Sequence, residues 1–335
     1  MHSSAGARLS ELLAPTRRLA LVGLAKNTGK TETLTSLLDE HARAGVRVGV
    51  TSIGRDGERR DVIDARISKP RVRLQAGDLV ASTGALLNAS AAPHERLVRT
   101  GIRTPLGEVV IARLEREGTL EVAGPSASSD VRAVSEAMIE LGAEQVLIDG
   151  AVDRRAASSP AVADGLVMAT GAVLGRDIEQ VASATADAVE VVRLPLAADA
   201  DADAGVVLER QLVLGGEPAE IEALLERHAD ASTFVVDGAL SERFLEGLLA
   251  ARHKHAQREL TIVAEDPTRV FLARRAPAWY ARQGIAIEVL RPIELKAITV
   301  NPVAPQSHRL DSAGLREAVA AAVGEVPVLD VREPV

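Results

Sequence analysis

The chain has 335 residues, a formal net charge of −8 and no cysteine. An acidic balance argues against nucleic acid as the main partner, because neutralising phosphates requires a basic surface. The lack of cysteine excludes disulfides, thiolate metal sites and cysteine nucleophiles, and no apolar run approaches a membrane span in length. We therefore expect a soluble cytoplasmic protein without a membrane partner.

Strand-like and helix-like stretches alternate along the chain, which favours an α/β fold with a mostly parallel sheet flanked by helices. Residues 1–16 are small, polar and basic and lack an apolar signal core, so we expect a flexible leader or a short helix there. An apolar strand is expected at 19–23 and a helix at 30–44, with Gly45 at its end.

The same alternation continues through the rest of the first half. The expected elements, in chain order, are a strand at 47–53, a β-hairpin over 108–124 that turns near Glu117 and Gly118, an amphipathic helix over 129–142, a strand ending in Asp149, a strand at 165–173 and a helix at 178–188. We expect these elements to form one domain over residues 17–195.

The composition changes to alternating Ala and Asp over 196–205. We interpret this segment as a solvated acidic linker or loop, since nothing beside it would fix the geometry of a cation site. Beyond it we expect a hairpin at 206–214 and strands at 233–237, 260–264, 285–290 and 297–300, with helices between most of them. Residues 206–335 are therefore also expected to be α/β, either as a separate region or as a continuation of the same sheet.

The stretch "LALVGLAKNTGKTETL" (19–34) predicts a phosphate-binding loop between a strand and a helix. Such a loop needs backbone N–H groups that converge on an anion at a helix N-terminus, a lysine that reaches the outer phosphates, and a hydroxyl for Mg²⁺. Gly29 opens the helix, Lys30 is the reaching cation and Thr31 offers the hydroxyl. The alternative is a helix that only happens to begin with Gly-Lys-Thr.

This loop is one residue longer than the usual pattern, because Gly23 stands one position earlier than the expected glycine. Small and polar residues fill the loop and suit contact with phosphates. The further candidate nucleotide contacts are Lys26, Asn27, Thr28 and Glu32.

A phosphate site also needs a carboxylate in the water shell of Mg²⁺, usually at the end of a neighbouring strand. Asp149 fits that place and Asp237 competes with it, although each could simply cap a turn. Asp153 is a candidate for orienting the attacking water. Asp56 follows the second strand, where a switch loop that touches Mg²⁺ or a partner would lie, but such charges are commonly only solvated.

The longer loop resembles that of dethiobiotin synthetase and its relatives in the SIMIBI branch of P-loop proteins. Several phrases in order resemble one family, the KamB-type subunit of the lysine 5,6-aminomutase reactivase, over about residues 18–331. The phrases are "VGLAKNTGKTETL", "TSIGRDGE", "KPRV", "VAGPS", "LIDGAVDRR", "ATGAVLGRDIEQV" and "TVNPVAP" followed by "VPVLDV".

That resemblance implies a chaperone-like ATPase that opens an adenosylcobalamin-dependent mutase, so that damaged cobalamin exchanges for intact cofactor. The implied cofactors are ATP and Mg²⁺. The implied partners are lysine 5,6-aminomutase and a second reactivase subunit, in a homo- or hetero-oligomer. Other members of the branch carry a second loop lysine where this chain has Ala25, and the neighbouring Lys26 could serve a similar purpose across a dimer interface.

The identity of the base is predicted from the segment "VNPVAP". Dethiobiotin synthetase-like proteins use an Asn and a Pro at this place to recognise adenine, and Asn301 and Pro302 match them. The Asn-Lys-x-Asp box that recognises guanine is absent, so we expect ATP. An ordinary loop between a strand and a helix is the alternative for this segment.

Two other functions stay open. One is a dethiobiotin synthetase-like enzyme that uses ATP to activate a small carboxylate or carbamate, with Arg66, Lys69 and Arg155 as candidate cations. The other is a metallochaperone-type GTPase. For that function His253 and His255 are the only close histidine pair, and two positions apart on a helix they point to different faces.

Overall fold

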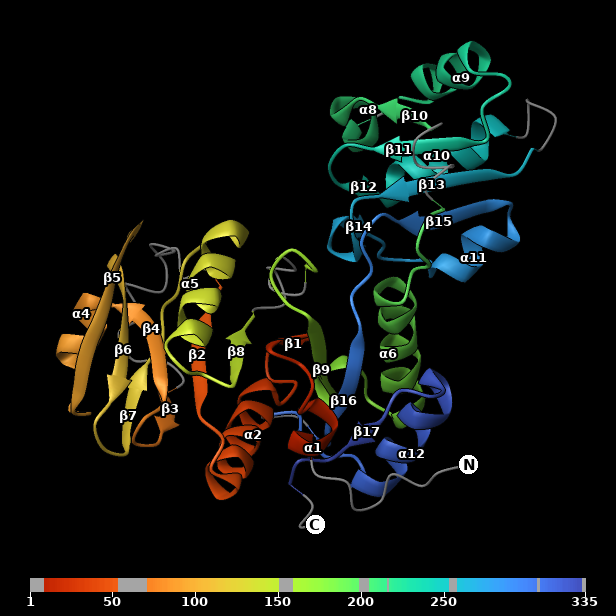
Figure 1. Ribbon diagram of the computed structural model, residues 1–335. Helices are drawn as coiled ribbons and strands as arrows, with labels where there is room; N and C mark the ends of the chain where they lie inside the picture. Colours follow the sequence, from red (N-terminus) through yellow and green to blue (C-terminus); the bar gives the residue numbers. More distant parts are fainter. Residues whose placement is uncertain are drawn as a thin grey trace. The chain divides into compact units, whose positions relative to one another are not determined.

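The computed structural model describes residues 9–53, 71–150, 159–198, 205–215, 217–252, 258–305 and 308–332. It is α/β and divides into two compact units, one made of Met1–Ser183 with Glu294–Val335 and the other of Ala184–Ile293. Figure 1 labels the helices and strands of both. The expected architecture, a mostly parallel sheet flanked by helices, is confirmed. None of the described helices is both long and apolar enough to cross a bilayer.

In its described part, the first unit is built on a nine-stranded sheet in the order β17-β16-β9-β1-β8-β2-β4-β6-β5. The strands are β1 (Arg18–Gly23), β2 (Val48–Ser52), β4 (Leu79–Thr83), β5 (His94–Thr104), β6 (Gly107–Leu114), β8 (Gln145–Asp149), β9 (Gly165–Gly171), β16 (Leu295–Asn301) and β17 (Val328–Leu329). Neighbours from β17 to β4 run parallel, whereas β6 pairs antiparallel with both β4 and β5. The parallel strands are continuous apolar runs because helices cover both faces of the sheet.

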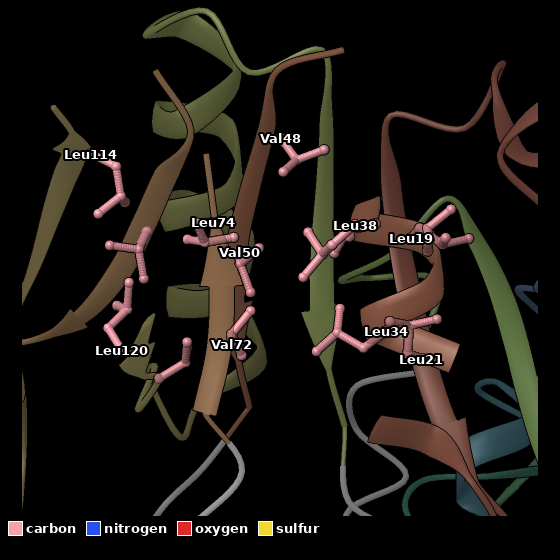
Figure 2. Packing of buried hydrophobic residues seen from close by; sticks show 14 of the residues in the cluster. Leu19, Leu21, Leu34, Leu38, Val48, Val50, Val72, Leu74, Leu114 and Leu120 are labelled. Atoms are coloured by element: carbon pink, nitrogen blue, oxygen red, sulfur yellow. The ribbon is translucent and has the colours of Figure 1, made fainter. Parts of the chain in front are cut away.

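Helix α2 (Lys30–Ala44) begins and ends where the sequence predicts. Its first turn follows Gly29, and Gly45 ends it in the left-handed conformation with a φ of 69°. Leucines at helical spacing on its inner face pack against the side chains of β1, as Figure 2 shows for Leu34 and Leu38 against Leu19 and Leu21. The opposite face of the sheet carries α5 (Ser128–Glu140), which packs on β2 and β8 through residues that include Val131 and Met138.

Of the two forms expected for residues 1–16, a flexible leader or a short helix, the second half of the segment takes the helix. Residues Leu9–Leu13 form helix α1, in which the side chains of Leu9 and Leu13 are 2% and 0% exposed. Their spacing places both leucines on one face, so even a short helix buries them against α2 and the core of the first unit. The side-chain amide of Gln145 then fixes the end of this segment by donating to the carbonyl oxygens of Leu13 and Thr16, at 3.0 and 2.7 Å.

The expected hairpin over 108–124 is also wrong. Strand β6 pairs with β4 and β5, whereas β7 (Gly118–Glu121) pairs with β3 (Arg71–Leu74) in a separate two-stranded sheet. The true hairpin joins β5 to β6, and helix α4 (Gly84–Ala89) packs against β6. Alternating apolar residues identify a strand but do not say which strand pairs with it, so two strands that are adjacent in the sequence need not form a hairpin.

The second unit, Ala184–Ile293, has its own core and, in its described residues, a parallel four-stranded sheet in the order β10-β11-β13-β15. Its strands are β10 (Val206–Leu208), β11 (Thr233–Val236), β12 (Leu240–Ser241), β13 (Leu260–Ala264), β14 (Val270–Phe271) and β15 (Ile285–Val289). Its helices are α8 (Arg210–Gly215), α9 (Pro218–Arg227), α10 (Glu242–Arg252), η3 (Pro267–Arg269) and α11 (Pro277–Arg282). The strands expected at 233–237, 260–264 and 285–290 are confirmed to within a residue.

Two expectations about this part of the chain are corrected. The hairpin expected at 206–214 is instead the short strand β10 followed by helix α8. The linker expected at 196–205 begins as paired backbone, because Leu196 bridges to Val289 and the N–H of Ala197 donates to the carbonyl oxygen of Val289 at 2.9 Å. Residues 199–204 lie outside the described residues.

The division into units also differs from the expected boundaries at 17–195 and 206–335. Helix α6 (Ile178–Val192), which follows η2 (Ala172–Leu174), contains the point where the first unit gives way to the second. After Ile293 the chain returns to the first unit, where β16 pairs with β9 and α12 (Ser312–Val323) packs on β16 and β17. Strand β16 is apolar and buried along most of its length, which suits its place between β9 and β17 inside the large sheet.

Candidate functional site

The candidate site lies at the carboxyl end of β1. In the strand order β1 stands between β8 and β9, and the chain leaves it through α2 toward β2 on the β8 side. The strands that follow later, β9 and β16, lie on the other side. Such a reversal of strand order opens a crevice outside the carboxyl ends of the strands, which is where open α/β sheets bind ligands.

The segment from Gly23 to Gly29, here called the glycine loop, joins β1 to α2. At its start the N–H of Leu24 donates to the carbonyl oxygen of Ala169 at the end of β9, at 2.9 Å. Asn27 and Gly29 both have positive φ, of 67° and 92°. At Gly29 a Cβ would also lie 2.8 Å from the Cβ of Asn301, so this position needs glycine for its conformation and for the space it leaves.

Asn301, at the end of β16, lies beneath the glycine loop. Its side chain is 6% exposed; the amide nitrogen donates to the carbonyl oxygen of Asn27 at 3.2 Å and the amide oxygen accepts from the N–H of Val303 at 3.1 Å. A second contact between the same elements joins the hydroxyls of Thr33 in α2 and Thr299 in β16 at 2.7 Å. The loop and the first turn of α2 are therefore held from below by one neighbouring strand.

These contacts bear on the residues expected to recognise adenine. Asn301 uses its amide to support the glycine loop, and the buried Pro302 accepts a bond from the N–H of Leu310 to its carbonyl oxygen at 2.9 Å. Recognition of the base by these two residues stays a prediction, whereas the supporting role of Asn301 is a feature of the structure that the sequence did not indicate.

Lys30 and Asp149 form the central ion pair of the site. The Lys30 ammonium donates to Oδ1 of Asp149. The two side chains are 22% and 26% exposed, so the pair lies at the surface of the crevice and not inside the core. Asp149 is held in place by its strand, because it aligns with Leu21 of β1 on one side and with Ser52 of β2 on the other.

The competing acid, Asp237, has different surroundings. It belongs to the second unit, where it follows β11 and pairs with Arg210 at 3.3 Å; its side chain is 69% exposed. Of the two candidate carboxylates, the structure brings Asp149 to Lys30.

A small cavity adjoins the ion pair on the side of α2 that faces β2 and β3. Its lining combines four polar and four apolar side chains: Thr31, Leu34, Thr35, Val50, Arg71, Val72, Val122 and Asp149. Figure 2 shows Val50, Val72 and Leu34 from this lining in the same buried cluster. The hydroxyl of Thr31 and the carboxylate of Asp149 are hard oxygen donors, the kind that Mg²⁺ prefers, so the residues present fit that ion.

The other predicted nucleotide contacts have mixed surroundings. Lys26 and Asn27 are exposed on the glycine loop, whereas Thr28 is buried and its hydroxyl donates to the carbonyl oxygen of Ala25 at 3.0 Å. Glu32 is exposed and pairs with the guanidinium of Arg332 at 2.9 Å, a contact between α2 and the end of the described chain.

Several predicted residues lie outside the described residues. They are Asp56, Asp153, Arg66, Lys69, Arg155, His253 and His255. In the described part of the chain, no group of three or more His, Asp or Glu side chains is arranged to hold a metal ion.

Arg71 is the member of the site that sequence reasoning missed. It belongs to the phrase "KPRV", which carries part of the family resemblance but does not by itself indicate a role for this arginine. The available signal was its place as the first residue of an alternating strand of two arginines and two apolar residues. Comparison of the chain with protein-family models, with curated proteins and with solved structures gives no match.

Proposed function

We propose that this chain is a P-loop nucleotide-binding protein of the SIMIBI branch that binds ATP with Mg²⁺ at the glycine loop and hydrolyses it. The observation that supports this most strongly is the pairing of Lys30 with Asp149. It joins the first residue of the helix after the glycine loop to a carboxylate at the end of the adjacent parallel strand. A helix that begins with Gly-Lys-Thr by coincidence would have no reason to meet such a carboxylate at a ligand-binding crevice.

Each residue of the site has a role in this proposal. Backbone N–H groups of the glycine loop and the positive end of α2 bind the phosphate tail. With nucleotide bound, Lys30 would exchange the carboxylate of Asp149 for oxygens of the outer phosphates. Thr31 and Asp149 are the residues that would hold Mg²⁺ and its water shell. Mg²⁺ supplies charge neutralisation on the phosphate oxygens.

We further propose that ATP turnover drives reactivation of an adenosylcobalamin-dependent aminomutase, as the resemblance to the KamB-type reactivase subunit implies. In physical terms, the nucleotide state would bias an element of this chain that binds an open form of the mutase better than its closed form. Moving such an equilibrium across its range takes about 5.5 kcal/mol of differential binding. A second reactivase subunit and the mutase are the proposed partners.

Nucleotide binding is tested by calorimetry with MgATP, MgADP and MgGTP on the purified chain. Lys30→Ala should weaken MgATP binding at least about tenfold, because it removes hydrogen bonds to a charged group. Arg43→Ala removes a cation from the exposed last turn of the same helix and should leave binding unchanged. Failure of the unaltered chain to bind any of the three nucleotides at millimolar concentration would refute the proposal.

The reactivation role needs a separate assay. Inactivated lysine 5,6-aminomutase is mixed with the chain, the second subunit, MgATP and fresh adenosylcobalamin, and recovered mutase activity is measured. The proposal expects recovery with the unaltered chain and with Arg43→Ala, and none with Lys30→Ala. ATP hydrolysis that a small carboxylate accelerates, without any recovery of the mutase, would instead indicate a dethiobiotin synthetase-like enzyme.

A further inference from the structure

Strand β3 presents two arginines on one side and two apolar residues on the other. Val72 and Leu74 are buried in the core of the first unit, and Arg71 and Arg73 are exposed. The two arginines share a strand, a face and a charge, so differences between their surroundings show what each position does.

Arg73 has a structural partner. Its guanidinium Nε donates to Oε1 of Glu117 at 2.6 Å. The guanidinium of Arg71, by contrast, makes no hydrogen bond or ion pair with any residue in the part of the chain that the structure describes, and Arg71 lines the cavity that Thr31 and Asp149 also line. Arg71 is therefore a cation at the candidate phosphate site whose charge is not matched by the described residues.

The backbone around Arg71 is held close to the carboxyl ends of the central strands. Arg71 pairs with Glu121 across the β3–β7 sheet. Three residues beyond Glu121, the N–H of Gly124 donates to the hydroxyl of Ser52 at 3.0 Å, and Ser52 aligns with Asp149 in the large sheet. The strand that carries Arg71 is thus anchored to the same edge of the sheet as the ion pair.

We propose that Arg71 binds the terminal phosphate of the nucleotide held by the glycine loop and stabilises the charge that develops there during hydrolysis. This inference rests on the proposed function. In the reaction, the oxygen of a water molecule attacks the γ-phosphorus and the bond from that phosphorus to the β–γ bridging oxygen breaks. The electron pair leaves with ADP, and the proton of the water passes to the medium, giving ADP, inorganic phosphate and H⁺.

Guanidinium chemistry suits this task. An arginine presents a planar fork of five N–H donors that matches two phosphate oxygens at once, and it stays charged at every physiological pH. Arg71 lines the cavity from the β3 side together with Asp149, the carboxylate that Lys30 pairs with from the start of α2. The two cations would therefore reach the outer phosphates from different elements. An arginine that neutralises the transferring phosphate from within the same chain acts as arginine fingers do in other nucleotide hydrolases, where the effect on turnover is about 10³–10⁵-fold.

The test compares Arg71→Gln and Arg71→Lys with the matched control Arg73→Gln. Affinities for MgADP and for a non-hydrolysable MgATP analogue are measured by calorimetry, and hydrolysis is measured in single turnover. Arg71→Gln should lower affinity for the triphosphate analogue at least about tenfold and leave MgADP binding unchanged. It should slow hydrolysis by about 10³-fold. Arg71→Lys keeps the charge but lacks the planar guanidinium, so its affinity for the triphosphate analogue and its rate of hydrolysis should lie between those of Arg71→Gln and the unaltered chain. Arg73→Gln should match the unaltered chain in both.

The outcomes distinguish a failure of the role of Arg71 from a failure of the proposed function on which that role rests. If the unaltered chain binds neither nucleotide, both the proposed function and the role of Arg71 are wrong. If it binds both, and the two Arg71 variants retain its preference for the triphosphate analogue and its rate, only the role of Arg71 is wrong. Circular dichroism checks folding of each variant; should Arg71→Gln fail to fold, the ratio of triphosphate to diphosphate affinity in Arg71→Lys decides, and an unchanged ratio overturns the inference.

Discussion

The side-chain amide of Asn301 donates to the backbone carbonyl oxygen of Asn27 at 3.2 Å, across 274 positions of sequence. Asn27 is the one described residue other than glycine with a positive φ, a conformation that costs energy unless its surroundings hold it. The hydrogen bond from Asn301 stabilises this conformation of Asn27. The geometry of the glycine loop therefore depends on a strand that the chain completes only after it has passed through the second unit.

The first prediction concerns this bond. Asn301→Asp keeps the acceptor for the N–H of Val303 but replaces the donor that faces Asn27 with a carboxylate oxygen. We expect a loss of about 1–3 kcal/mol in the free energy of unfolding, because a donor is lost and two oxygens are forced together. Urea unfolding measures it. Asn88→Asp makes the same chemical change at an exposed position of helix α4, where the amide oxygen already accepts from Arg96, and should cost nothing.

The second prediction uses two glycines at the two ends of α2. Gly29 and Gly45 both have positive φ, but a Cβ at Gly29 would meet Asn301 at 2.8 Å, whereas a Cβ at Gly45 would meet nothing within 4 Å. Both alanine variants should lose about 1–2 kcal/mol from backbone strain. Gly29→Ala alone should also displace the glycine loop and abolish MgATP binding in calorimetry. Equal nucleotide affinity in the two variants would show that the close approach of Asn301 does not govern the loop.

Sequence reasoning found those parts of the site whose signals are local. The strand, the Gly-Lys-Thr turn and the leucine spacing of α2 lie within about two dozen consecutive residues, and the acid at the end of β8 follows an apolar run that marks a buried strand. These signals depend on backbone conformation and periodicity, which neighbouring residues determine. The pairing of Lys30 with Asp149 then follows from the parallel arrangement of their elements.

Contacts between distant segments could not be found in this way. Nothing in the residues around Arg71 indicates that β3 leaves its neighbours to pair with β7, and the apolar run of β16 gives no sign that it belongs to the first sheet and not to the second. Pairing is decided by how whole strands pack, whereas a single sequence shows only each strand by itself. These pairings bring Asn301 to the glycine loop and Arg71 to the cavity beside Asp149.

The third prediction tests whether α1 belongs to the core. Leu13 is fully buried and Leu12 is only partly buried against the same cluster. Leu13→Ala should cost about 2–5 kcal/mol in the free energy of unfolding, as truncation of a buried leucine does, and Leu12→Ala should cost clearly less. Thermal unfolding followed by circular dichroism compares them. A flexible leader would make both substitutions harmless.

Glu242 in the second unit provides a prediction that depends on pH. The residue is 8% exposed. Its carboxylate accepts from the N–H groups of Ala273, Arg274 and Arg275 at 3.0–3.1 Å and from the hydroxyl of Tyr280 at 3.3 Å. Burial by itself would raise the pKa of Glu242, but these four donors outweigh it and hold the pKa below its ordinary value of 4.5. The burial of Tyr280 itself, together with the nearby carboxylate of Glu242, raises the pKa of the Tyr280 hydroxyl.

A carboxylate with a lowered pKa in the folded state contributes stability that is complete above the unfolded pKa and is lost as the pH falls through the folded one. The unaltered second unit should therefore lose stability below about pH 4.5, whereas Glu242→Gln should lose less over that range, because its amide does not titrate. At pH 7 the variant should already be less stable by about 1–3 kcal/mol, since an amide oxygen cannot accept from all the donors and the N–H groups of the amide face those donors unfavourably.

The single tryptophan of the chain, Trp279, lies in α11 beside Tyr280 and reports unfolding of this unit by fluorescence. Glu246→Gln on the same helix, whose carboxylate pairs with Arg274 at the surface, is the control and should follow the unaltered chain below pH 4.5; identical acid profiles for Glu242→Gln and the unaltered chain would contradict the assignment.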